Sequence, residues 1–175
     1  MKHYQNCRGM TVVAANEIAR PLAGKRYKNP ALVWAAILSF GAALLHLATI
    51  AGGEDWYRAM GAGEQMARMA RAGDPYPTYL TLFIAAVLSL WGLFALAGAG
   101  VIRKLPFTRL ALYIITAVYT LRGVYGLGIA ALMGAEMIEH PYLSSLGIGF
   151  WLLSSSICLG IGLVHITGLR KGLFF

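Results

Sequence analysis

Two polar side chains lie deep inside apolar segments of this 175-residue sequence, and both are of types that can do chemistry. Arg122 has apolar sequence on both sides, and His46 lies within another apolar run. An arginine at membrane depth costs at least about 2.5–3.5 kcal/mol on insertion scales, so it normally faces a protein interior, a partner or a water-filled cavity. Arginine can hold an anionic group, and histidine can shuttle protons.

Helical geometry predicts nearly equal depths for these two residues. At 1.5 Å per residue, Arg122 lies about 20 Å above the cytoplasmic edge when counted from Arg109. His46 lies about 22 Å above the same edge when counted from Ala31. The two could therefore line one outward-facing polar pocket.

Three further residues complete the candidate pocket. Tyr119 and Tyr125 lie three residues on either side of Arg122, where they could hydrogen-bond or stack on its guanidinium. An outer-loop carboxylate, Glu64, could lie above them. The candidate polar pocket thus comprises His46, Arg122, Glu64, Tyr119 and Tyr125.

Each of these residues also has a purely structural interpretation. Arg122 could extend its long side chain toward the outer headgroups. His46 could be a buried histidine bonded to a backbone or hydroxyl group, and the tyrosines could simply pack between helices. We assign no catalytic residue.

We expect no metal and no cofactor. Cys7 lies in a polar tail and Cys158 in an apolar run, so a disulfide between them is not expected, and no Cys-His cluster has zinc-ligand spacing. His46 and His165 differ in depth by roughly 16 Å, which excludes a shared haem. Nucleotide-binding loops and metalloprotease motifs are absent from the sequence.

The elements that must position these residues are four membrane-spanning helices. Hydrophobic residues make up 58% of the chain and charged residues only 13%, with the charges gathered between long apolar runs. Continuous runs exclude a β-barrel. The predicted spans are about 31–52, 78–100, 107–133 and 142–168. They form one all-α antiparallel four-helix domain over 30–169, between a basic tail at 1–29 and a short tail at 170–175.

Charge placement predicts the direction of the spans. Basic residues prevail in the N-terminal tail, in the second loop and after the fourth span, whereas six of the seven acids lie in the first and third loops. Both termini should therefore be cytoplasmic, in the cell inner (plasma) membrane of a bacterium. The net charge of +8 belongs to these flanks, so we expect no nucleic-acid partner.

The first outer loop contains a helical pattern. Over residues 54–72, apolar and small residues fall on one arc and charged residues fall opposite. The pattern predicts a short helix in the outer interface or a cap over the bundle, and a solvated connector is the alternative.

The layout resembles small four-helix bacterial inner-membrane proteins of the DoxX-like kind. The resemblance covers the topology of about residues 30–170. It rests on Pro75-Tyr76-Pro77 closing the outer loop, on the glycine-ended second span, and on the basic turn Arg103-Lys104-Leu105-Pro106. Some members of that group are linked to quinone-dependent redox complexes. The resemblance carries no site residues to this chain.

Short loops and the lack of catalytic motifs favour a non-enzymatic role. We expect an accessory subunit or a binder of a small amphiphile, with the lipid bilayer and either a membrane protein or a second copy as partners. The alternatives are a membrane enzyme that uses the His/Arg/Glu pocket and a small oligomeric transporter.

Overall fold

The computed structural model describes residues 29–135, 137 and 141–172, and this part of the chain is all helical. Its helices are α2 (Pro30–Ala59), α3 (Glu64–Arg71), α4 (Tyr76–Gly98), α5 (Thr108–Gly134) and α6 (Pro141–Arg170). Four of them, α2, α4, α5 and the Gly147–Arg170 part of α6, are long and apolar enough to cross a membrane. The predicted all-α fold with four spans is confirmed. The tail at 1–28 and the third-loop acids Glu136 and Glu139 lie outside the described residues.

α2 begins where the sequence supplies a cap and a proline. The Asn29 side chain accepts a hydrogen bond from the Leu32 N–H at 3.3 Å, and Pro30 occupies the first turn, where no N–H is needed. The Asn29 amide also donates to the carbonyl oxygens of Gly168 and Gly172, at 2.8 and 2.9 Å. Asn29 therefore joins the start of α2 to the end of α6.

The outer loop folds differently from a single continuous helix over 54–72. Gly53, with φ of 65°, bends α2, and the residues that follow continue it only to Ala59. Gly61 and Gly63 have φ of 75° and 91°, conformations that interrupt a helix and suit glycine. The chain therefore turns before α3 starts. The short loop helix is confirmed, and its predicted extent was wrong.

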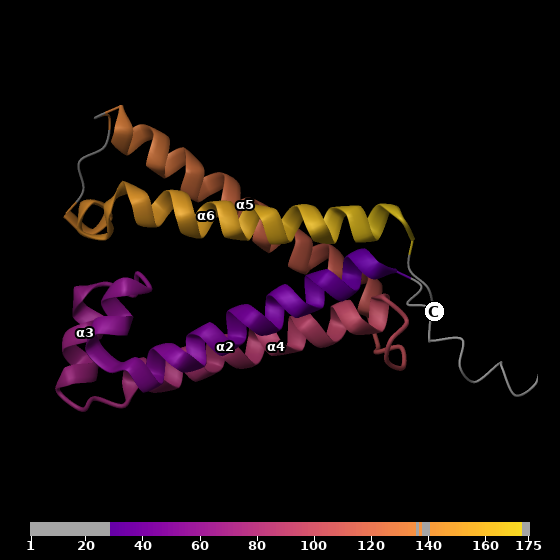
Figure 1. Ribbon diagram of the computed structural model, residues 1–175, viewed down its shortest axis with the longest axis horizontal. Helices are drawn as coiled ribbons and strands as arrows, with labels where there is room; N and C mark the ends of the chain where they lie inside the picture. Colours follow the sequence, from indigo (N-terminus) through magenta and orange to yellow (C-terminus); the bar gives the residue numbers. More distant parts are fainter. Residues whose placement is uncertain (1–28, 136, 138–140, 173–175) are drawn as a thin grey trace, which may run out of the picture.

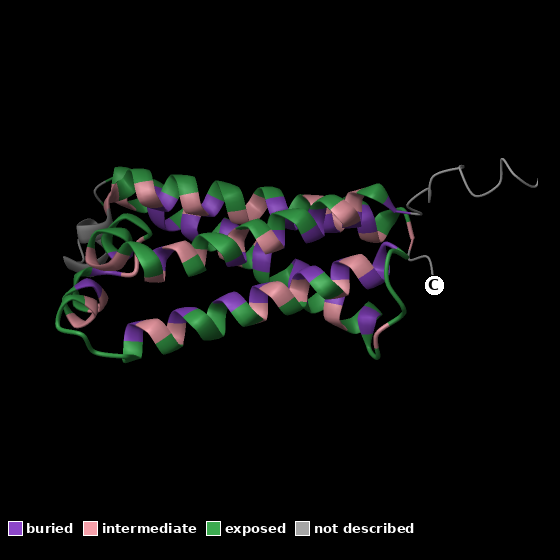
Figure 2. Cartoon of the chain, turned by 60° about the horizontal axis from the view of Figure 1, so that its bottom comes forward, coloured by how far each residue is buried: buried purple, intermediate pink, exposed green. Residues whose placement is uncertain are grey.

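The long helices form two hairpins, α2 with α4 and α5 with α6 (Figure 1). α5 and α6 approach closely at glycines: a Cβ on Gly123 would lie 2.7 Å from the backbone nitrogen of Leu159. Figure 2 shows buried residues where the helices face one another and exposed residues on the outer surfaces. Side chains such as Leu44, Phe83 and Leu121 are exposed there, as expected of a lipid-facing surface.

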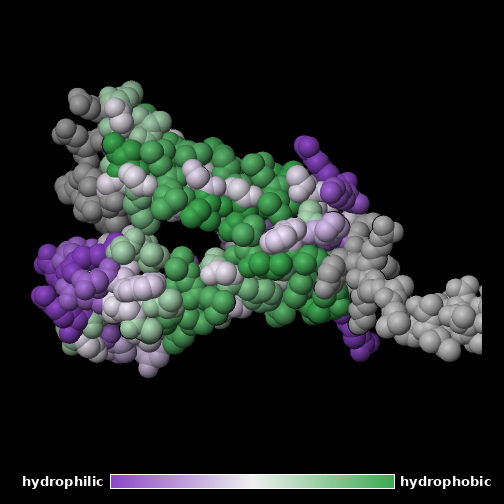
Figure 3. Space-filling model, in the orientation of Figure 1, coloured by the Kyte–Doolittle hydropathy of each residue, from purple (hydrophilic) through white to green (hydrophobic). Residues whose placement is uncertain are grey.

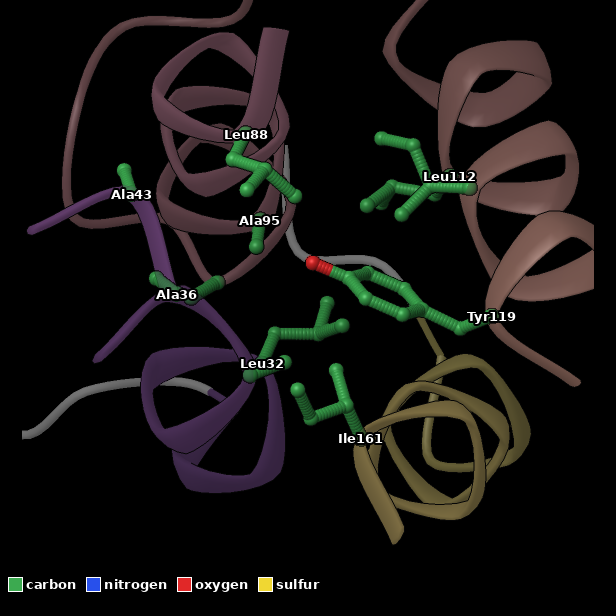
Figure 4. Close-up of a cluster of buried hydrophobic side chains, with 11 residues drawn as sticks. Leu32, Ala36, Ala43, Leu88, Ala95, Leu112, Tyr119 and Ile161 are labelled. Carbon is green, nitrogen blue, oxygen red and sulfur yellow. The ribbon is translucent and has the colours of Figure 1, made fainter. Parts of the chain in front are cut away.

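One hydrophobic core joins the two hairpins, and it occupies the half of the bundle near Asn29. It draws on the first half of α2 and of α5 and on the second half of α4 and of α6, and Figure 4 shows these side chains converging from the four helices. Its buried residues are Leu32, Ala35, Ala36, Ala43, Leu88, Ala95, Ala99, Leu112, Ile115, Tyr119 and Ile161.

The halves of the hairpins farther from Asn29, called the outer halves below, do not share this core. A second cluster there, formed by Ile129, Ala130 and Trp151 with Met133, belongs to α5 and α6 alone. Figure 3 shows open space between the two hairpins in this half. We call it the interhairpin opening: it is bounded at its inner end by Tyr119 and at its outer end by Gly61 and Phe150.

Candidate functional site: the interhairpin opening

Tyr119 forms the inner end of the opening and contacts all three other long helices. Its ring meets Trp91 of α4 edge-to-face, with centroids 5.1 Å apart, and stacks on His165 of α6 at 5.8 Å. Its hydroxyl lies 3.3 Å from the Ser39 hydroxyl of α2, within hydrogen-bond distance. A single tyrosine thus connects the two hairpins where they part.

His165 lies behind Tyr119 without any exposed surface. Neither of its ring nitrogens has a hydrogen-bond partner. Buried polar groups are usually hydrogen-bonded, so this imidazole is an exception. Its stack on Tyr119 holds the ring in place.

Arg122 lies on the α5 side of the opening, about 4.5 Å further outward along the helix axis than Tyr119. Its guanidinium donates to the Ser155 hydroxyl at 3.3 Å, and its Cζ lies 5.4 Å from the ring centroid of Trp151. Both partners belong to α6 and neither is a carboxylate. Every ion pair among the described residues involves Arg58, Arg68 or Arg71 instead. The charge of Arg122 is therefore not neutralised by any described carboxylate.

His46 lies on the opposite side of the opening. It follows Ser39 by seven residues, and residues seven apart share a helix face. Ser39 points across to Tyr119, so this face of α2 is the one turned toward α5. His46 is half-buried, about 10 Å further outward than Ser39. Its Nδ1 lies 2.8 Å from the carbonyl oxygen of Ala42, which fixes the ring against its own helix.

A network of ion pairs covers the outer side of the α2–α4 hairpin. Arg58 pairs with Glu54, with Asp55 at 3.4 Å and with Glu64 at 2.7 Å, and Arg68 pairs with Glu64 at 3.1 Å. Hydrogen bonds from Arg58 and then from Arg68 lower the pKa of Glu64 to about 2. We call residues 54–71 the outer cap.

The outer cap contacts the second hairpin at Phe150 of α6. A Cβ on Gly61 would overlap the ring of Phe150, so the glycine backbone lies directly against that ring. On the other side, Tyr57 is buried and its hydroxyl accepts a hydrogen bond from Thr81 of α4 at 3.3 Å. The cap is therefore anchored to the first hairpin and touches α6 across the outer end of the opening.

The structure separates the five residues of the predicted pocket. Arg122 and His46 lie on opposite sides of the opening and Tyr119 lies at its inner end. Glu64 belongs to the outer cap, and Tyr125 is 64% exposed on the outer surface of α5. Among the described residues, no hydrogen bond, ion pair or ring contact joins any two of the five.

Several residues of the site were not predicted. Ser155 and Trp151 hold Arg122, His165 stacks on Tyr119, and Arg58 organises the cap. The sequence spacing of residues 122, 151 and 155 does not predict that they meet. Their contacts depend on how α6 is oriented about its own axis where it packs against α5. Arg58 had a local signal: it lies four residues after Glu54 and three after Asp55.

The arrangement suits binding of a molecule that has an apolar body and a polar head. The helices of the two hairpins are apolar, and each hairpin carries a half-buried polar side chain, Arg122 on α5 and His46 on α2. Within the described residues, no group of three or more His, Cys, Asp or Glu side chains could hold a metal ion.

Comparisons of the chain with protein-family models, with curated proteins and with solved structures give no match. The resemblance to DoxX-like proteins therefore stays a prediction.

Proposed function

We propose that this membrane protein binds a small amphiphile in the interhairpin opening, with the polar head of the ligand at Arg122. The observation that carries the proposal is the un-neutralised guanidinium beside a space that opens between apolar helices. A cation at this depth is unfavourable unless something balances it, and an anionic or strongly accepting head group would do so.

The shape of the opening supports the same proposal. The hairpins share a core only in their inner halves, so their outer halves present apolar surface to each other without filling the space. An acyl chain or another apolar body would fill it. The contact between Gly61 and Phe150 lies at the outer end, so lateral access from the bilayer suits a ligand that partitions into lipid.

We further propose that the protein lies in a bacterial inner membrane with both termini cytoplasmic. The start of α2, the α4–α5 turn and the end of α6 lie at one end of the bundle (Figure 1). Arg103, Lys104, Arg170 and Lys171 belong to that end, and the acids of the outer cap belong to the other. Cysteine-labelling of intact cells tests this: Lys104→Cys should resist a membrane-impermeant maleimide, and Asp74→Cys should react.

Native mass spectrometry in mild detergent tests the binding. We expect the wild-type protein to carry a bound small molecule that Arg122→Gln loses. Arg109→Gln, an exposed arginine at the start of the same helix, is the matched control and should keep the ligand.

Two outcomes contradict the proposal. One is a ligand that stays bound in Arg122→Gln at wild-type occupancy. The other is an empty wild-type protein that copurifies in fixed stoichiometry with another membrane protein, which favours an accessory subunit in which Arg122 has a packing role.

A further inference from the structure

We propose that Phe150 is a hydrophobic seal, which closes the outer end of the interhairpin opening against Gly61 and keeps water and water-borne ligands away from Arg122. This inference rests on the proposed function and specifies the source of its ligand, an amphiphile dissolved in the bilayer. It is carried by the fit of the Phe150 ring against the outer cap and by the contacts that hold Gly61 in position.

The ring of Phe150 and the backbone of Gly61 leave no room for a side chain between them. A Cβ added to Gly61 would overlap the ring carbons Cζ, Cε1 and Cε2 of Phe150. Gly61 also has φ of 75°, so backbone conformation and space both favour glycine here. Surfaces packed this closely leave no gap that holds a water molecule. The contact therefore suits a seal.

The outer cap holds Gly61 from both sides of its turn. Arg58, three residues before Gly61, pairs with Glu64, three residues after it, at 2.7 Å. The Gly61 N–H donates to the carbonyl oxygen of Arg58 at 3.0 Å. Next to Arg58, the buried Tyr57 hydroxyl accepts a hydrogen bond from Thr81 of α4 at 3.3 Å. The turn that carries Gly61 is thus closed on itself and fixed to the first hairpin.

Phe150 is positioned on the second hairpin, between Arg122 and the outer end of the bundle. Its ring meets Trp151 edge-to-face, with centroids 6.2 Å apart, and Trp151 in turn lies 5.4 Å from Cζ of Arg122. Phe150 precedes Ser155, the hydrogen-bond partner of Arg122, by five residues, which places it about 7.5 Å further outward along α6. A ligand that enters from the outer aqueous phase would have to pass Phe150.

The side of the opening differs from its outer end. Figure 3 views the bundle across its helix axes, and the gap between the hairpins is visible on this face, which is turned toward lipid in a membrane. The second hydrophobic cluster belongs to α5 and α6 alone and does not bridge the gap to the first hairpin. A molecule that is already in the bilayer can therefore reach the opening between the hairpins.

A seal at Phe150 strengthens the binding proposed at Arg122. With water kept out at the outer end, the guanidinium charge is balanced by the head group of the ligand rather than by hydration. An amphiphile with a long apolar body concentrates in the bilayer, since each buried methylene contributes about 0.8 kcal/mol. A water-soluble anion gains nothing from lipid and is blocked at the outer end. The structure thus favours a lipid-dissolved amphiphile over a water-borne anion.

Spin-label accessibility of the full chain in phosphatidylcholine vesicles tests both routes. A nitroxide is attached at His46→Cys, on the α2 side of the opening, in a background with Cys7→Ser and Cys158→Ser. Oxygen collides with the label from lipid, and nickel ethylenediaminediacetate collides with it from water. With Phe150 present we expect high oxygen and low nickel accessibility. Phe150→Ala should raise nickel accessibility about tenfold, because an apolar space excludes a polar complex at least that strongly.

Matched variants isolate the seal from general effects of substitution. Phe83→Ala makes the same change at a phenylalanine that is 65% exposed on α4, and nickel accessibility should stay low. Gly61→Ala should raise it as Phe150→Ala does, because the added Cβ displaces the ring. Gly73→Ala is the control for Gly61→Ala: Gly73 has φ of 76°, but no atom lies within 4 Å of its added Cβ. Unfolding in sodium dodecyl sulfate shows that each variant keeps the fold.

The outcomes separate this inference from the proposed function. High nickel accessibility in the presence of Phe150 overturns the seal, as does an equal response of Phe150→Ala and Phe83→Ala. Low oxygen accessibility at residue 46 overturns exchange with lipid. None of these results concerns ligand binding at Arg122, which native mass spectrometry tests. An empty protein there contradicts the proposed function and the ligand source, whereas a nickel response confined to Phe150→Ala and Gly61→Ala still supports the seal.

Discussion

The hydroxyl groups of Ser39 and Tyr119 lie 3.3 Å apart at the level where the two hairpins separate. Tyr119 is the outermost α5 residue of the shared core, and its ring also contacts Trp91 and His165. Around and inward of this point the hairpins share a hydrophobic core, and further outward Gly61 of the outer cap contacts Phe150 of α6. The Ser39–Tyr119 contact is therefore a polar link across the base of the opening.

Tyr119→Phe should destabilise the bundle only slightly. The change removes the hydroxyl contact with Ser39 and keeps the ring contacts, so we expect a loss of about 0.6–1 kcal/mol. Unfolding in sodium dodecyl sulfate, followed by circular dichroism, measures it. Tyr125→Phe is the control, since that side chain is largely exposed and should show no change. Equal losses in the two variants would mean that the link to Ser39 contributes nothing.

Gly126→Ala should displace Arg122. A Cβ at Gly126 would overlap the Ser155 hydroxyl and lie 2.6 Å from Nη1 of Arg122. We expect a loss of about 1–3 kcal/mol from overpacking, together with weaker ligand binding. Gly128→Ala is the matched control, because no atom lies within 4 Å of its added Cβ. The prediction fails if both alanines are tolerated equally in unfolding and in native mass spectrometry.

The spans and the loop helix could be predicted from the sequence because both are local properties. Apolar run length determines what can cross a bilayer, and the Asn29-Pro30 pair marks a helix start without knowledge of the rest of the chain. The extent of the loop helix was misjudged because periodicity alone does not show where a glycine adopts positive φ, as Gly61 and Gly63 do.

Counting residues gives the position of Arg122 and His46 along their own helices, but neither the register between the helices nor the rotation of each one. Ser39 lies opposite Tyr119, so His46 and Arg122 lie about 10 Å and about 4.5 Å beyond that level rather than at nearly equal heights. Tyr125 is three residues from Arg122 yet lies on the exposed side of α5. The stack of His165 on Tyr119 joins residues far apart in the sequence, so it could be found only once α6 was placed against α5.

His165→Phe should raise the stability of the protein. The imidazole is fully buried and both its nitrogens lack partners, a condition that costs about 1–3 kcal/mol. Phenylalanine keeps a ring against Tyr119 without those polar atoms. We expect stability to increase by about 1 kcal/mol in the same detergent titration.

His165→Leu separates the two contributions of this side chain, because it removes both the polar atoms and the ring stack. It should be less stable than His165→Phe. A folded His165→Phe protein that is less stable than the wild type would contradict the prediction, and would indicate that the nitrogens bind an internal water.

The outer cap should respond to acid through Glu64. The folded-state pKa of about 2 lies below the ordinary value of 4.5, so the ion pairs contribute stability above the ordinary value. That contribution is lost as pH falls from about 4.5 through about 2. A carbon-13 titration of labelled glutamate side chains, assigned with Glu64→Gln, measures the pKa directly. In Arg58→Gln it should move up toward 4.5, because Arg58 is the main cause of the shift. A Glu64 carboxylate that titrates near 4.5 in the wild type would exclude persistent pairing.

Asn29→Asp should show that Asn29 does more than cap α2. Aspartate keeps the oxygen that accepts from the Leu32 N–H, so the cap survives. The substitution removes the amide that donates to the carbonyl oxygens of Gly168 and Gly172. A carboxylate oxygen then faces these two carbonyl oxygens at a fully buried position, where it cannot donate to them. We expect a loss of about 1–3 kcal/mol in detergent unfolding, and faster amide hydrogen exchange at the end of α6. Equal stability of the two proteins would assign the whole contribution of Asn29 to the cap, and the hairpins would then be joined at this end by the hydrophobic core alone.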